Sequence, residues 1–493
     1  MPAKNAFSPT KRLAAPAPSI RLLTVALLWL APVLLVLVSA PKEAILSTTA
    51  LAAVVCAAAQ VMRPTSIVVT LPFFALLSPV TGLLDWVWAR VLFSDLLFCL
   101  LAVQAAVSVI TRPSNALSHM PVVFRLLAML FMVSVVVSYA VGYLISLKPL
   151  LYLAQLSIVA YFTSNYTTHH QDWLKLQRAW FIASVYGSVI MFQAYSEVRS
   201  LDILKDADSV LVAYSDDLSQ LFRATYYYSG FHYILGLCIV SACIRLFFPA
   251  TRVHQLALLL ALVMMVLALV AGVNKTAIAA IAVAIIATAL ALFLRFRREM
   301  TFSILCLAAL GSGGLAAGIV VLQYDQLDAS MQINLIIERL ISASSFFLRL
   351  EVFSQALTLW SESLWTMLLG FGPDFLDNSG NPAYSILLKT SPITGYTEGT
   401  LDSAWLSYLI ELGLPGLLLL AALFAGGIIK ALRGLRSNPC FDERTFAEAS
   451  LFGGLVFLVI AMTTQMLGYT KTSWLPLQLL VVAWIGLRTR GAD

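Results

Sequence analysis

The chain has 493 residues, of which 60% are hydrophobic and only 11% carry a charge. A soluble protein normally carries about a quarter charged residues, so this composition excludes a soluble globular protein and predicts a polytopic membrane protein. The net charge of +6 is spread over the polar segments between apolar stretches, and we expect no nucleic-acid partner.

Apolar windows of about 17–25 residues mark helices that cross a bilayer. They predict an all-α fold, a transmembrane bundle of about 14 helices. The windows lie near residues 22–39, 44–62, 66–84, 91–110, 122–146, 149–164, 174–195, 229–249, 255–272, 276–294, 301–322, 403–427, 450–468 and 473–487. The first is longer than the roughly 7–15-residue core of a signal peptide, so we expect it to be retained.

The first long polar interval, 196–228, carries two features of interest. Its Asp206-Ala207-Asp208 run has the spacing of metal-dependent glycosyl transfer, but its surroundings are those of a solvated loop, and we expect no metal. Arg223 and Tyr228 close the interval and are candidates for substrate binding. His232, one turn into the next helix, is a further candidate, with a packing histidine as the alternative.

Lys275 is a further candidate, in a tight turn between two apolar windows. Positive residues are under-represented in short turns on the outer side of a membrane, so its position there calls for a role. The alternative is an ordinary turn residue.

The second long interval, 323–400, is the longest polar stretch, and long connections of this kind are commonly functional. Arg349, Phe353, Leu357 and Trp360 recur at three- to four-residue spacing, which predicts one face of an amphipathic helix at the membrane surface. Arg349 is a candidate catalytic residue, or otherwise a snorkelling cation, and Trp360 is a candidate for substrate binding. A Gly370-Phe371-Gly372 turn follows.

Asp402 stands at the start of the next apolar window, whose helix contains Glu411-Leu412-Gly413-Leu414-Pro415-Gly416. Its carboxylate could take a proton from an attacking hydroxyl, cap the helix, or do both. The cations Arg349, Lys275 and Arg223 together suggest an anionic ligand such as a phosphate or pyrophosphate, because cations stabilise charge on a phosphate leaving group.

The distribution of Lys and Arg predicts the orientation in the membrane. With the N-terminus in the cytoplasm, twenty of the 31 basic residues fall on the inner side. These are Lys4, Lys11, Arg12, Arg21, Arg63, Arg112, Arg125, Lys175, Arg178, Arg245, Arg252, Arg295, Arg297, Arg298, Lys430, Arg433, Arg436, Arg444, Arg488 and Arg490. Both termini are then cytoplasmic, and both long intervals lie outside. We expect a cytoplasmic tail (1–20), a membrane domain (21–487) and a second tail (488–493).

Six cysteines are present, and none is spaced as a metal site or a disulfide framework. Small apolar fillers are the expected role.

Four features, spread over roughly residues 220–425, resemble the O-antigen polymerase and O-antigen ligase superfamily, also called Wzy-type exopolysaccharide polymerases. They are the arginine-led segment from Arg223 to Gly230, the outer turn with a basic residue at Lys275, the run from Arg349 through Gly372, and the Asp402–Gly416 motif. In ligases the last motif generally begins His-Asn. Here it reads Asp402-Ser403, and the 323–400 interval has no histidine, which favours a polymerase.

The resemblance implies a GT-C-like, metal-independent, inverting glycosyl transfer without cofactors, at the periplasmic face of the bacterial inner membrane. The donor and acceptor would both be glycans on undecaprenyl pyrophosphate, and a chain-length regulator and export machinery are further candidate partners. Arg349 and Lys275 would hold the pyrophosphate, Arg223 would assist, and Asp402 would orient or deprotonate the acceptor.

Two alternatives remain open from the sequence. The first is an O-antigen ligase. The second, from another class, is a flippase or transporter of lipid-linked glycans. Transporters tend to have internal repeats and a site near the bilayer midplane. No repeat of fixed period stands out here, and ionisable residues inside the windows are few, chiefly Asp95, so the sequence favours the enzyme.

Overall fold

The structure is a computed structural model. It describes residues 72, 82–86, 89–92, 102–103, 105–106, 121–141, 148–167, 169–197, 211–216, 221–226, 231–248, 251–271, 275–296, 353–354, 356–373, 375, 403–461 and 473–487.

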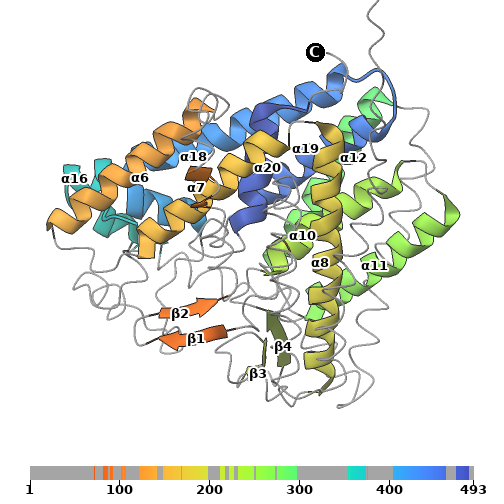
Figure 1. The fold of residues 1–493 in the computed structure, drawn as a ribbon, viewed down its shortest axis with the longest axis horizontal. Helices are drawn as coiled ribbons and strands as arrows, with labels where there is room; N and C mark the ends of the chain where they lie inside the picture. The colour runs from red at the N-terminus through yellow and green to blue at the C-terminus, as the bar shows by residue number, and fades with distance from the viewer. Residues whose placement is uncertain are drawn as a thin grey trace, which may run out of the picture.

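Within these ranges the fold is a bundle of helices (Figure 1). They are α6 (Val122–Val141), α7 (Lys148–Tyr166), α8 (His170–Glu197), α10 (Phe231–Leu246), α11 (Arg252–Ala271), α12 (Lys275–Arg295), α16 (Leu364–Leu369), α18 (Ala404–Ser437), α19 (Glu443–Ala461) and α20 (Trp474–Ile485). Among the described residues, five helices are long and apolar enough to cross a membrane: α6, α11, α12, α18 and α19. The helical membrane class is therefore confirmed.

Nine predicted windows coincide with described helices, from 122–146 (α6) through 276–294 (α12) and from 403–427 (α18) to 473–487 (α20). Windows 22–39, 44–62 and 301–322 lie outside the described residues, so the total of fourteen stays a prediction.

Two short antiparallel hairpins accompany the helices, at the lower edge of the view in Figure 1. β1 (Gly82–Trp86) pairs with β2 (Ala89–Leu92), and β3 (Leu211–Asp216) pairs with β4 (Leu221–Tyr226). The hydropathy windows did not predict them. The first hairpin includes the end of window 66–84 and the start of window 91–110. These residues were predicted as helix because a hydropathy average does not separate the two-residue period of a strand from the helical period.

Contacts between helix ends show which ends lie on the same side of the bundle. Arg245, in the last turn of α10, forms an ion pair of 2.6 Å with Glu443, the first residue of α19. At the other end the indole N–H of Trp405, near the start of α18, donates to the carbonyl of Val459 at 3.4 Å. The Phe441 ring lies 4.1 Å from that of Phe248 and 5.2 Å from that of Phe296, just past the ends of α10 and α12.

The first residues of α10, α12 and α18 therefore lie at one end of the bundle, with the last residues of α19. We call this the Lys275 end. The last residues of α10, α12 and α18 lie at the opposite end with the exposed Cys440, which we call the Cys440 end.

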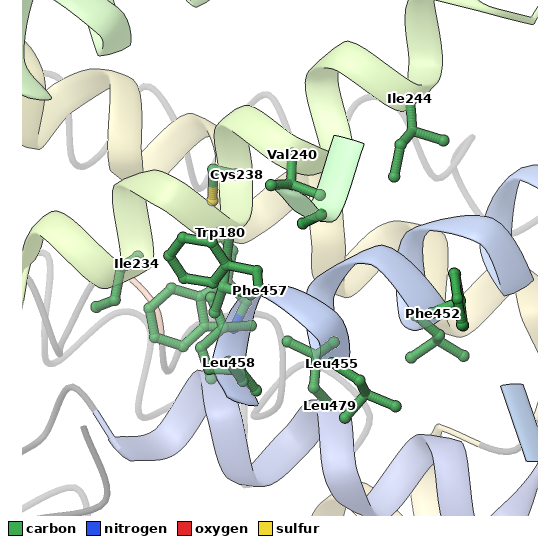
Figure 2. Close-up of a cluster of buried hydrophobic side chains, with 14 of the residues drawn as sticks. Trp180, Ile234, Cys238, Val240, Ile244, Phe452, Leu455, Phe457, Leu458 and Leu479 are labelled. Atoms are coloured by element: carbon green, nitrogen blue, oxygen red, sulfur yellow. The ribbon is translucent and has the colours of Figure 1, made fainter. Parts of the chain in front are cut away.

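The main core lies where α8, α10, α19 and α20 meet (Figure 2). Trp180 is buried there, and its indole N–H donates to the side-chain carbonyl of Gln478 at 2.8 Å. Small residues allow the helices to approach closely, as is common in membrane proteins. A β-carbon on Gly236 of α10 would lie 2.3 Å from the Phe457 ring of α19, and one on Gly453 would lie 2.7 Å from the Thr288 hydroxyl of α12.

Two helices, α18 and α19, extend furthest beyond one end of their predicted windows. α18 runs to Ser437 rather than ending near 427, and α19 begins at Glu443 rather than near 450. Asp442 explains the second start, since its carboxylate accepts hydrogen bonds from the N–H groups of Arg444 and Thr445 at 3.1 and 3.0 Å. Such a capped first turn is polar, so a hydropathy average excludes it.

Candidate functional site

Helix α18 is broken three turns from its start. Gly413 has φ 69° and ψ −173°, a conformation that is essentially restricted to glycine, and Pro415 follows it inside the helix. In an unbroken helix the carbonyl of Glu411 would accept the N–H of residue 415, but proline has none. The break therefore leaves carbonyl groups that need donors from elsewhere.

The Gly370–Gly372 segment supplies these donors. The N–H of Phe371 donates to the carbonyl of Ile410 at 2.8 Å, and that of Gly372 donates to the carbonyl of Glu411 at 2.9 Å. The approach is very close: a β-carbon on Gly370 would lie 2.3 Å from the Glu411 carbonyl carbon, and one on Gly413 would lie 2.5 Å from that of Leu368. Both contact positions thus require glycine, and Gly370 also has positive φ, at 68°.

Helix α6 also forms hydrogen bonds at this contact between the Gly370–Gly372 segment and α18. Ser134 donates its hydroxyl to the carbonyls of Leu369 and Glu411, at 3.1 and 3.2 Å. Ser138, one turn on, donates to the carbonyl of Phe371 at 2.9 Å. Figure 1 shows α16 and α6 beside α18. Segments more than 230 residues apart in the chain are therefore joined by main-chain acceptors and side-chain donors.

The short helix α16 leads directly into the Gly370–Gly372 segment. Ser363 caps it, accepting the N–H of Thr366 at 3.0 Å, while Thr366 accepts the N–H of Ser363 at 3.2 Å. This reciprocal pair is a capping box. It fixes where the helix begins and hence where the following glycines lie.

A separate small core supports the segment. It consists of Ala356, Leu359, Phe371, Phe375 and Ile410. The rings of Phe371 and Phe375 stack with centroids 4.5 Å apart. Because the small core includes Ile410 of α18, burial of its side chains favours the docked position of the segment.

Trp360 is half-buried against this small core. Its predicted position at the membrane surface stays a prediction. Leu357 is 42% exposed, whereas Ala356 and Leu359 are buried. Spacing alone gave the correct period but not the direction of the neighbouring helix, which determines the buried face.

Three predicted site residues lie outside the described residues: Arg349, Asp402 and Tyr228. The alternative role of Asp402 as the helix cap is wrong, because the next residue, Ser403, is the N-cap of α18. The Ser403 hydroxyl accepts the N–H of Leu406 at 3.3 Å.

Two predicted cations, Arg223 and Lys275, are placed by their backbone. Lys275 is the first residue of α12, and Arg223 lies in β4 opposite Tyr214. The strand β4 contacts α8, α10 and α11. β4 precedes α10 in the chain, and α11 ends just before Lys275, so both cations lie at the Lys275 end. His232 lies there too, 1% exposed in the first turn of α10.

Sequence reasoning missed Ser134 and Ser138, and it gave Glu411 no role of its own. The Glu411 side chain is only 7% exposed within a membrane helix, and buried ionisable groups in such helices are functional candidates by default. The two serines had a readable signal: two hydroxyls four residues apart on one face of an apolar helix.

Residues 260–421 match the model of the family described as O-antigen ligase. This part of the chain is similar to the O-antigen polymerase and ligase superfamily, in agreement with the resemblance of its sequence motifs. Members of this family are membrane enzymes of O-antigen or glycan assembly. The matched range begins in α11 and ends in α18, so it includes Lys275, the Gly370–Gly372 segment and the break at Gly413, while α6 lies before it. No curated protein matches the chain.

Proposed function

We propose that this protein is a polysaccharide polymerase. It transfers a growing glycan from undecaprenyl pyrophosphate onto another lipid-linked repeat unit, at the periplasmic face of the inner membrane, in a GT-C-like bundle. The match of residues 260–421 to the O-antigen ligase family model supports the reaction class. The location of Arg223, His232 and Lys275 at one end of the bundle supports a single site on one side of the membrane.

The observation that carries the proposal is the docking of the Gly370–Gly372 segment on broken α18. In the chain this segment stands between Arg349 and Asp402. The segment carrying Arg349 enters the docked contact through α16, and the helix that follows Asp402 receives it at Ile410 and Glu411. We infer that this contact keeps Arg349 and Asp402 near one site, since close positioning is what a two-substrate transfer requires.

The chemistry follows from charge. An acceptor hydroxyl attacks the anomeric carbon, a new C–O bond forms with inversion, and the bond from that carbon to the pyrophosphate oxygen breaks. Arg349 and Lys275 stabilise the departing pyrophosphate, assisted by Arg223. Asp402 accepts the hydroxyl proton. His232, Tyr228 and Trp360 bind the glycan and its lipid anchor.

The test replaces Arg349 by alanine in cells that lack the native gene. We expect normal membrane abundance and at least a hundredfold loss of long-chain polysaccharide, since removing one charge-stabilising donor typically costs about that much. Arg433→Ala is the matched control, an exposed arginine near the Cys440 end, and should leave chain length unchanged. Wild-type chain length in Arg349→Ala would overturn the assignment of Arg349. Lipid-linked units trapped on the cytoplasmic side would indicate a flippase.

The second candidate function is an O-antigen ligase, which the description of the matched family favours. The same cells distinguish the two activities. Loss of a polymerase leaves single repeat units on their acceptor. Loss of a ligase leaves full-length polymer on undecaprenyl pyrophosphate.

A further inference from the structure

We propose that Ser134 and Ser138 of α6 are positioning residues for glycosyl transfer. Resting on the proposed function, the inference is that they fix the Gly370–Gly372 segment on α18 and thereby place the groups on either side of it. A helix outside the family-matched range then forms part of the catalytic apparatus.

The first support is the direction of their hydrogen bonds. Buried hydroxyls in membrane helices commonly donate to the carbonyl four residues earlier in their own helix. In this structure Ser188, Thr288 and Ser450 do so, each at 2.7 Å. Ser134 and Ser138 instead donate across to α16, α18 and the residue after Gly370.

The second support is the identity of the acceptors. The Glu411 carbonyl has lost its helical donor at Pro415, and the Leu369 carbonyl belongs to the last residue of α16. Carbonyls at helix ends and breaks need donors from other elements. Both serines are buried, at 1% and 2% exposed, so water does not readily replace them.

The third support is geometric. Ser134 and Ser138 are four residues apart, so both project from one face of α6. Ser134 contacts the carbonyls of Leu369 in α16 and Glu411 in α18. Ser138 contacts the carbonyl of Phe371, between Gly370 and Gly372. Removing both hydroxyls takes away three of the five hydrogen bonds described here between this segment, α6 and α18, and leaves the N–H donors of Phe371 and Gly372.

The test compares Ser134→Ala/Ser138→Ala with wild type in purified enzyme, using a synthetic undecaprenyl-pyrophosphate repeat unit. We expect kcat to fall about tenfold or more with KM within about twofold, because small displacements of positioned groups cost large factors in rate. Thr at both positions retains the donors and should recover part of the rate. Ser188→Ala, a buried serine that bonds within its own helix, is the matched control and should keep the wild-type rate.

A second readout reports docking without any activity. Ala356 is fully buried in the small core, so Ala356→Cys, with the six native cysteines replaced, should resist maleimide. In the double-alanine background we expect its labelling rate to rise severalfold. A wild-type kcat, or a reduced kcat with unchanged labelling of Cys at 356, would overturn the proposal. If Arg349→Ala polymerises normally, the proposed function fails, and the labelling experiment still decides whether the serines hold the segment.

Discussion

Two glycines, Gly370 and Gly413, are the residues on which the docked contact depends most directly. Both have φ near +68° with ψ near 180°. Each also lies so close to the backbone of the other's segment that an added β-carbon would overlap with it. The requirement is therefore twofold: an unusual backbone conformation and no side chain. Either one alone would favour glycine strongly.

We accordingly expect Gly413→Ala to destabilise the protein. The strained backbone costs about 1–3 kcal/mol, and the overlap with Leu368 adds to it. The measurement is the thermal midpoint of purified protein in detergent. Gly427→Ala in the same helix is the matched control, since its nearest neighbour would lie at an ordinary 3.4 Å. Equal midpoints for the two variants would contradict this account.

The sequence predicted these two glycine-containing motifs but not the contact between them. The Gly370–Gly372 turn and the Glu411–Gly416 run were recognised separately, and the structure shows that they bind one another. No local pattern encodes such a contact. The cap at Asp402 failed for the same reason: it depends on which neighbouring atoms are near, and spacing carries no such information.

The broken helix α18 is the element that organises the site. Its first part receives the Gly370–Gly372 segment, and its second part continues to the Cys440 end. The break is encoded by Gly413 and Pro415 together, because proline removes the N–H that would otherwise compete for the Glu411 carbonyl.

Restoring a continuous helix should therefore release the segment. In Gly413→Ala/Pro415→Ala the N–H of residue 415 can bond to Glu411, a change worth up to about 3 kcal/mol for proline in a helix interior. We expect the thermal midpoint to rise relative to Gly413→Ala, while neither variant makes polymer. Full chain length in the double variant would show that docking on the break is dispensable.

Element boundaries were less predictable than element positions. Nine windows coincided with helices because long apolar runs are strongly constrained by the bilayer. The start of α19 at Glu443 did not follow from hydropathy, since a capped polar turn precedes its apolar face. The hairpin β3–β4 likewise formed inside an interval that looked like a plain loop.

For the whole molecule, the proposed function requires the Lys275 end to face the periplasm. Helix directions and the contacts of β4 place Arg223, His232 and Lys275 at the same end of the bundle, and the basic run from Lys430 to Arg436 lies toward the opposite end. The excess of Lys and Arg then predicts that the Cys440 end is cytoplasmic.

This orientation can be measured with the native Cys440, which is exposed. In intact spheroplasts we expect a membrane-impermeant maleimide to spare Cys440 and to label it after permeabilisation. A cysteine at Leu364, 73% exposed in α16, should react without permeabilisation. The reverse pattern would place the candidate site in the cytoplasm and contradict the proposed use of periplasmic substrates.

A polymerase joins lipid-linked repeat units to one another. The direct measurement supplies purified protein with one synthetic undecaprenyl-pyrophosphate repeat unit and separates the products by size. We expect a ladder of oligomers that differ by one repeat, with one undecaprenyl pyrophosphate released for each bond formed. No oligomer from this substrate, together with transfer of preformed polymer onto a lipid A core, would contradict it and identify a ligase.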